Sequence, residues 1–356
     1  MGLFESMLGS NESLFKNPDA LEYEFMPKLF LYREQEQKKI AGVIAPMFHE
    51  KTGRNAFIFG PPGIGKTLAM LKVIEELKEK TDDIVPLYIN CWSKNTTFKI
   101  LIEMCGQLEF RFTQNKRTEE LLKVVKQLLN KKSAVFIFDE IDKVEDFDFL
   151  YSMVEDIYKK SIIIITNYKE WLTDLDERVK SRLLPEMIKF RQYTPQETEG
   201  ILRQRRDYAF HANVWDDDAF TLVCQKTAEV KDIRTGLYLM KEAGNLAESK
   251  SSRKITAHFA AEAIAKLQEF QSKDIDVLQD SEHTILDLIR QHSGSRIGEL
   301  FKLYEKQGGT QTYKTFQRRI EKLEKGNFIS AQKTEGGKDG NTTIVHYGKT
   351  KKLTEF

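Results

Sequence analysis

Five short apolar runs alternate with longer stretches of helical spacing between residues 55 and 190. The runs are rich in β-branched and aromatic residues, which favour strands, and they are too short to be helices. Strands that alternate with helices along a chain usually pair in parallel, and helices cover both faces of the resulting sheet. The pattern therefore predicts an α/β domain over residues 1–194, with strands at 56–59, 85–89, 135–138, 162–166 and near 187–190.

Pro86 lies inside the second apolar run. Proline has no backbone N–H and cannot donate to a neighbouring strand, so within sheets it is confined mainly to edge strands. We therefore expect the strand at 85–89 to lie at an edge of the sheet.

Helical patterning replaces the β-rich runs after residue 194 and predicts a small helical domain over residues 195–270. Residues 271–280 are polar and separate two helical patterns, so we expect a linker there, with Ser281 as the N-cap of the next helix. The helical spacing is clearest at Leu237, Met240, Ala243, Leu246 and Ala247.

Three helical patterns and two β-rich runs make up the C-terminal stretch. The helical patterns cover 281–292, 295–306 and 312–325, and the β-rich runs at 328–333 and 342–347 flank a glycine-rich segment. Three helices followed by a β-hairpin are the order of a winged helix, which we expect over residues 281–356.

The third of these helices has an apolar side and a basic side. At 100° per residue, Tyr313, Phe316, Ile320 and Leu323 share one side, and Lys314, Arg318, Lys322 and Lys325 lie opposite. Lys338 lies at the hairpin tip, and eleven Lys and Arg stand against four Asp and Glu between residues 306 and 352. These features suit a helix in the major groove of double-stranded DNA. Glu321 shares the basic side, so a solvated charged face is one alternative and a protein-binding winged helix is another.

Composition places few limits on the partners, with 40% hydrophobic and 31% charged residues and a net charge of +1. The apolar runs are too short to cross a bilayer, and no secretion signal precedes them. We therefore expect no membrane association and a cytoplasmic, nucleoid-associated location. Cys91, Cys105 and Cys224 form no Cys-x-x-Cys pair, which argues against a disulfide framework and structural zinc.

A glycine-rich motif joins the first apolar run to a helix that begins near Leu68. In a Walker A phosphate loop the backbone N–H groups surround phosphates, the lysine supplies charge to the β- and γ-phosphates, and the threonine binds Mg²⁺. A chance glycine-rich turn is the alternative. The motif consists of Gly60, Pro61, Pro62, Gly63, Ile64, Gly65, Lys66 and Thr67.

Two other apolar runs end in polar residues, one in Asp139 and Glu140 and the other in Asn167. The carboxyl ends of parallel strands form the edge where α/β folds bind ligands. We expect Asp139 to hold Mg²⁺ together with Thr67, and Glu140 to polarise the attacking water. Asn167 is expected to reach the γ-phosphate or the water, although a turn-forming Asn is the alternative. The sequence lacks the Asn-Lys-x-Asp motif that reads guanine, which favours ATP.

The sequence resembles the AAA+ superfamily, and within it the archaeal replication initiators related to the origin recognition complex and its helicase-loading ATPase. The resemblance begins at Pro27, Tyr32 and Arg33, which match a family stretch beside the adenine. It implies an AAA+ nucleotide-binding domain, a helical lid domain and a C-terminal winged helix. Tyr32 and Arg33 are therefore expected to contact the nucleotide.

The resemblance also implies roles for two arginines. Residues 175–183, with the sequence LDERVKSRL, match a family element in which Arg182 would be the arginine finger for a neighbouring subunit's ATP. Arg178 is the second choice for this role. Arg234 matches a family Asp-x-Arg element that reaches the γ-phosphate from the lid. A solvated basic helix and a surface ion pair are the respective alternatives.

The match departs from the family in two places. Residues 94–114 lie where relatives carry an insertion that can touch DNA, but they hold no decisive motif. Tyr168 follows Asn167 where Asp is commoner, although the amide is kept.

These features predict a slow, switch-like ATPase that uses ATP and Mg²⁺, binds double-stranded DNA and acts in origin recognition or helicase loading. Expected partners are further copies or related AAA+ subunits, and the replicative helicase. A clamp-loader subunit is one rival, although it should lack the winged helix. The rival from another class is a nucleotide-gated transcription regulator, or a plasmid or mobile-element DNA-binding ATPase.

Overall fold

A computed structural model of the chain describes residues 13–130, 132–276, 280–309, 311–325, 328–334 and 342–347. It divides into two compact units, Met1–Ile264 and Ala265–Phe356. Within the described ranges, no helix is long and apolar enough to cross a membrane.

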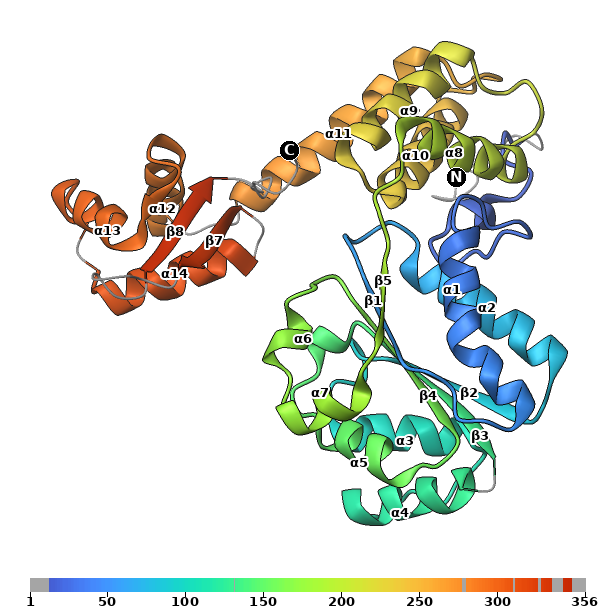
Figure 1. The fold of residues 1–356 in the computed structure, drawn as a ribbon. Helices are drawn as coiled ribbons and strands as arrows, with labels where there is room; N and C mark the ends of the chain where they lie inside the picture. Colours follow the sequence, from blue (N-terminus) through green and yellow to red (C-terminus); the bar gives the residue numbers. More distant parts are fainter. Residues whose placement is uncertain are drawn as a thin grey trace. The chain divides into compact units, whose positions relative to one another are not determined.

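A five-stranded parallel sheet forms the centre of the first unit (Figure 1). Its strand order is β2-β3-β4-β1-β5, so the strand that carries Pro86 lies at an edge, as the proline predicts. All five expected strands are confirmed, with ends that differ by a few residues at most. The strands are β1 (Ala56–Phe59), β2 (Ile84–Asn90), β3 (Ser133–Asp139), β4 (Lys160–Thr166) and β5 (Glu186–Lys189).

Helices cover both faces of the sheet, because alternate strand residues bury their side chains in two separate apolar cores. Phe136 and Phe138 of β3 point into one core, and Val135 and Ile137 point into the other. The first core is covered by α3 (Thr97–Gln107), α4 (Thr118–Leu129), α5 (Asp148–Asp156), α6 (Trp171–Asp174) and α7 (Glu177–Leu183). The second is covered by α1 (Glu34–Ile44) and α2 (Lys66–Lys80). Short 3₁₀ helices are η1 (Pro18–Leu21), η2 (Ala45–His49) and η3 (Ile141–Lys143).

A helical domain follows β5, as expected. Its first helix begins with a capping box, in which the Thr194 hydroxyl accepts from the backbone N–H of Glu197 and the Glu197 carboxylate accepts from that of Thr194. Its helices are α8 (Pro195–Ala209), α9 (Asp217–Val230), α10 (Ile233–Ser249) and α11 (Ala257–Asp276).

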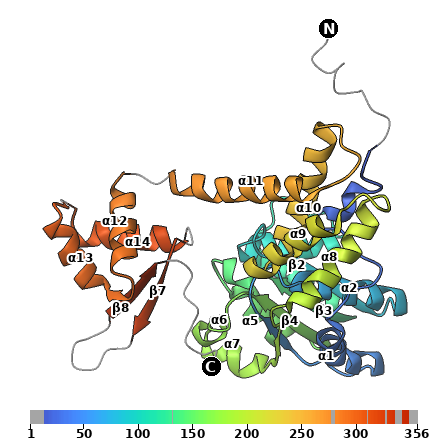
Figure 2. The ribbon, with the colours of Figure 1, turned by 90° about the horizontal axis from the view of Figure 1, so that it is seen from above.

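Helix α11 corrects the expected linker. Residues 271–276 are helical and continue α11, which begins in the first unit and ends in the second (Figure 2). A polar stretch can continue a helix where no proline or glycine interrupts it, and α11 contains neither. Ser281 is likewise not an N-cap, since α12 already includes Asp280.

The second unit combines three helices with a three-stranded antiparallel sheet in the order β6-β8-β7. Phe316, Ile320 and Leu323 of the expected apolar side are buried in its core, whereas Tyr313 is exposed. Strand β6 was not expected. The winged-helix assignment stays a prediction. The elements are α12 (Asp280–Gln291), β6 (Ser295–Arg296), α13 (Ile297–Lys306), α14 (Tyr313–Lys325), β7 (Ile329–Thr334) and β8 (Thr342–Tyr347).

Candidate nucleotide-binding site

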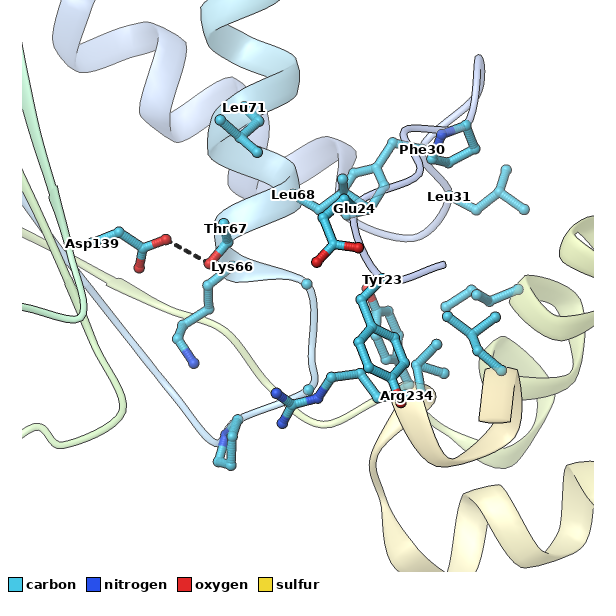
Figure 3. A pocket seen from close by; sticks show the side chains of 18 of the residues that line it. Tyr23, Glu24, Phe30, Leu31, Lys66, Thr67, Leu68, Leu71, Asp139 and Arg234 are labelled. Carbon is cyan, nitrogen blue, oxygen red and sulfur yellow. Dashed lines mark hydrogen bonds between the residues drawn. The ribbon is translucent and has the colours of Figure 1, made fainter. Parts of the chain in front are cut away.

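A cavity of about 510 Å³ lies at the carboxyl edge of the parallel sheet, next to the loop between β1 and α2. Pockets for small ligands commonly have volumes of this order. The walls come from the glycine-rich loop, the ends of β2, β3 and β4, the segment before α1, and the helices α8 and α10 (Figure 3). The cavity therefore collects residues from both the α/β domain and the helical domain.

The loop can follow its path only with glycine at several positions. Gly60, Gly63 and Gly65 all have positive φ, at 151°, 73° and 85°. A Cβ atom on Gly60 would lie 2.3 Å from the carbonyl oxygen of Phe190, which has no room to move. Close backbone approach and the left-handed N-cap at Gly65 leave the N-terminus of α2 open to the cavity.

Lys66 brings the loop and β4 together. Its Nζ donates to the carbonyl oxygens of Gly60 at 2.8 Å and Pro61 at 2.7 Å, and to Oδ1 of Asn167 at 2.7 Å. Burial lowers the pKa of Lys66 to about 8, with neighbouring carboxylates opposing the shift. The lysine thus rests on neutral acceptors, and a bound anion would supply the charge partner that they lack.

A hydrogen bond between Thr67 and Asp139 joins the start of α2 to the end of β3. Oγ1 of Thr67 donates to Oδ2 of Asp139 at 2.6 Å, which is the dashed contact in Figure 3. Burial raises the pKa of Asp139, whereas the hydrogen bonds that its carboxylate accepts lower it. A hydroxyl beside a carboxylate at the mouth of a phosphate loop fits Mg²⁺, because this ion takes oxygen ligands and keeps several waters.

Glu140 follows Asp139 and lines the same cavity with a left-handed backbone conformation, φ 55°. Burial, followed by the adjacent Asp139 carboxylate, raises the pKa of Glu140. Such a group can accept a proton from a water molecule.

Arg234 enters the cavity from the N-terminal end of α10, on the side of the loop that holds Lys66 (Figure 3). Its guanidinium donates to Oδ1 of Asp232 at 3.1 Å and to Oδ2 at 2.9 Å. The backbone N–H of Ile233 also donates to the carbonyl oxygen of Gly63 at 3.4 Å. The lid helix therefore touches the phosphate loop directly.

Tyr32 and Arg33, which the resemblance places at the nucleotide, do not line the cavity, and neither do Gly60, Pro61 and Ile64 of the loop. Arg33 is fully buried behind the loop, where it donates to the carbonyl oxygens of Ile64 at 3.2 Å and Arg191 at 2.5 Å. Its guanidinium also lies 3.9 Å from the centroid of the Tyr193 ring. Tyr32 lies with its hydroxyl against Gly200 instead. Arg33 therefore supports the back of the loop.

Neighbours of Tyr32 and Arg33 line the cavity in their place. Pro27 was expected beside the adenine, whereas Tyr23, Glu24, Phe30 and Leu31 were not expected. Arg205 holds that segment against α8, since its buried guanidinium donates to the carbonyl oxygens of Ala20 and Phe25, both at 2.9 Å. The lining residues from the segment are Tyr23, Glu24, Pro27, Phe30 and Leu31, and Figure 3 shows the Glu24 carboxylate directed into the cavity.

The two candidate finger residues lie on α7, outside the cavity lining. Arg182 pairs with Glu155 of α5 and lies 5.9 Å from the centroid of the Tyr151 ring. Arg178 is exposed. Neither arginine lines the cavity of its own chain, and the finger role stays a prediction.

The basic side of α14 is only partly free. Lys314 and Arg318 are exposed. Lys322 donates to the buried carboxylate of Glu282 at 2.8 Å, and Arg319 pairs with the same oxygen at 3.1 Å. The side chain of Lys325, and all of Lys338, lie outside the described residues.

Comparison with known proteins identifies the class and then the family. Residues 49–170 match the AAA domain, and residues 199–265 match the Cdc6 AAA+ ATPase-type lid domain. The sheet, loop and lid thus define an AAA+ ATPase. An ORC1-type DNA replication protein 1 from Sulfurisphaera tokodaii is 31% identical over 272 residues, covering 73% of this chain and 68% of that protein. The chain belongs to the ORC1-type DNA replication proteins and has a role in the initiation of replication.

Other relatives and solved structures extend this match over nearly the whole chain. An ORC1-type DNA replication protein 2 from Methanosarcina acetivorans is 29% identical, covering 94% of this chain and 93% of its own. The ORC1 protein of Aeropyrum pernix, solved in complex with DNA, has a TM-score of 0.72 at 22% identity and covers 96% of this chain and 95% of its own. Cdc6p from Pyrobaculum aerophilum has a TM-score of 0.65 at 16% identity, covering 94% of this chain and 95% of its own. The two structures show the shared fold.

Proposed function

We propose that the chain is an ATP- and Mg²⁺-dependent switch that binds double-stranded DNA during origin recognition or helicase loading. The observation that carries this proposal is the cavity itself, where Lys66, Thr67 and Asp139 of the α/β domain face Arg234 of the helical domain. A ligand held by all four would tie the two domains together. Its hydrolysis would release that tie.

Each residue has a distinct task in this proposal. Lys66 exchanges its carbonyl partners for the β- and γ-phosphates, and Thr67 and Asp139 hold Mg²⁺. Mg²⁺ supplies charge neutralisation when bound. Glu140 accepts the proton of the attacking water, and Asn167, held by Lys66, positions that water. In this proposal hydrolysis is slow, because its task is to switch the protein from one state to another and not to turn over ATP rapidly.

The second unit supplies DNA contacts in this proposal. Lys314 and Arg318 are exposed on α14, and the solved relative from Aeropyrum pernix was captured with DNA. A Drosophila origin recognition complex bound to DNA, with a TM-score of 0.57, shares the fold and has several subunits. We propose that this chain likewise works beside further copies or related subunits, and delivers the helicase. Its location is then the nucleoid.

Footprinting of the purified chain across its own genome, with ATP and with ADP, tests the proposal. We expect protection of repeated sites near a replication origin, with a pattern that depends on the nucleotide. Sites confined to promoters would favour a transcription regulator, and sites on a plasmid or mobile element would favour an element-encoded ATPase. Failure to bind ATP in a titration would overturn the proposal at its base.

A further inference from the structure

A tyrosine on the edge strand completes the donors around Asp139. Oη of Tyr88 donates to Oδ2 of Asp139 at 2.8 Å, the same oxygen that accepts from Thr67 at 2.6 Å. The backbone N–H of Glu140 donates to Oδ1 at 2.9 Å. Asp139 is only 2% exposed, so its orientation depends on these three protein donors.

Strand alternation places Tyr88 at the cavity. Leu87 and Ile89 are buried in the core on one face of the sheet, so Tyr88 and Asn90 face the other side and line the cavity. Tyr88 pairs with Ile137 in the parallel register, two residues before Asp139. Its hydroxyl therefore crosses from the edge strand to the carboxylate that ends the next strand.

The backbone of Tyr88 is fixed as well. An edge strand leaves some backbone groups without a partner strand. In Tyr88, both the backbone N–H and the carbonyl oxygen instead form hydrogen bonds with the Gln107 side chain of α3. Oε1 of Gln107 accepts from the Tyr88 N–H at 3.1 Å, and Nε2 donates to its carbonyl oxygen at 2.7 Å. Glu103 in turn accepts from Nε2 of Gln107 at 3.0 Å. The tyrosine is thus held at its backbone and at its hydroxyl.

We infer that Tyr88 is a positioning residue that holds the Asp139 carboxylate in the orientation in which it and Thr67 bind Mg²⁺. The inference rests on the proposed nucleotide function. A buried carboxylate with one donor removed can turn about its terminal torsion, because that torsion is broad. A freely turning carboxylate binds a metal ion less well than one fixed by surrounding donors, as for other groups around metal sites.

The test is Tyr88→Phe, which removes the hydroxyl and keeps the ring. ATP affinity is measured by titration at a series of Mg²⁺ concentrations and in EDTA. We expect unchanged affinity in EDTA and an increase of about tenfold in the Mg²⁺ concentration that gives half of the full effect, the scale of one hydrogen bond to a charged group. Tyr158→Phe is the matched control, since it removes a hydroxyl from an exposed tyrosine outside the cavity lining, and its Mg²⁺ midpoint should equal that of the parent.

A second variant keeps the test usable if Tyr88→Phe does not fold. Gln107→Leu frees the strand backbone without touching the hydroxyl, and it should shift the Mg²⁺ midpoint in the same direction by less. An unchanged midpoint in Tyr88→Phe, or an equal shift in Tyr158→Phe, would overturn the inference. Loss of ATP binding by the parent chain would instead overturn the proposed function.

Discussion

Glu140 is the carboxylate that we propose as the acceptor of the water's proton, since it follows Asp139 and lines the cavity. We expect Glu140→Gln to bind ATP with nearly the parent's affinity and to hydrolyse it at least about 100-fold more slowly, because an amide cannot accept the proton of water. ATP titration and phosphate release measure the two effects. Glu79→Gln, an exposed change on α2, is the control. Parent-like turnover in Glu140→Gln would remove the residue from its role.

Arg33 offers a test of position against direct contact. Its loss leaves the carbonyl oxygens of Ile64 and Arg191 without their donor and the Glu36 carboxylate without its ion pair. We expect Arg33→Met to lower the free energy of unfolding by about 3 kcal/mol, with ATP affinity falling as the loop loosens. Arg54→Met is the control, because the ion pair of Arg54 with Glu186 is exposed.

Denaturant unfolding and ATP titration on both variants separate the two accounts. A loss of ATP affinity with unchanged stability would return Arg33 to the nucleotide, as the sequence resemblance first indicated.

The candidate site could be predicted from the sequence where neighbours in the chain make it. The phosphate loop and the Asp139-Glu140 pair are local motifs, and the structure brings both to one cavity. Tyr88 and Glu24 were missed because their places depend on strand register and on packing of a distant segment. Arg33 lies outside the cavity lining for a related reason, since a family match gives closeness to a ligand but not the direction of a side chain.

At the scale of elements, the apolar runs were enough to find every strand of the parallel sheet. Buried parallel strands carry continuous apolar runs, which stand out from amphipathic helices. Strand β6 escaped because it is only two residues long, Ser295–Arg296, and pairs with β8 some fifty residues later along the chain. The end of α11 escaped because a polar helical segment and a polar linker have similar compositions.

Helix α14 carries a prediction at the same scale. Arg318 is exposed, whereas Lys322 is committed to the buried Glu282. We expect Arg318→Ala to cost about 1–3 kcal/mol of DNA affinity and to relax sequence preference. Lys322→Ala should weaken DNA binding less and lower the stability of the fold more, because it leaves a buried carboxylate with a missing partner.

Fluorescence anisotropy on specific and scrambled duplexes at several salt concentrations measures the DNA affinities. A variant that no longer binds one of the phosphates should have a logarithmic salt slope that is smaller by roughly one. Equal decreases in DNA affinity in the two variants would mean that Lys322 leaves Glu282 for the phosphates.

In the assembled protein, Arg182, which we propose as the arginine finger, would act on the nucleotide of another copy. Arg182 pairs with Glu155 of its own chain and lies outside the cavity. We expect Arg182→Ala and Glu140→Gln chains to be poorly active alone and to regain hydrolysis when mixed. In the mixture, an intact Glu140 can meet an intact Arg182 from a neighbour.

Phosphate release across a series of mixing ratios measures the rescue. Activity that never exceeds the sum of the separate chains would rule Arg182 out. If a mixture of Arg178→Ala and Glu140→Gln chains regains hydrolysis instead, Arg178 takes the role of the arginine finger.

Gly63 lies where the phosphate loop meets the start of the lid helix. A Cβ atom there would lie 2.1 Å from Oδ1 of Asp232, at the start of the lid helix, and φ is 73°. A methyl group at this position would therefore have to displace the Asp232 carboxylate. An alanine at this position would press against Asp232 of the lid, and it would also strain the loop because φ is positive there. A defect in Gly63→Ala would therefore combine strain in the loop with a contact against the lid, and it cannot be assigned to phosphate binding alone.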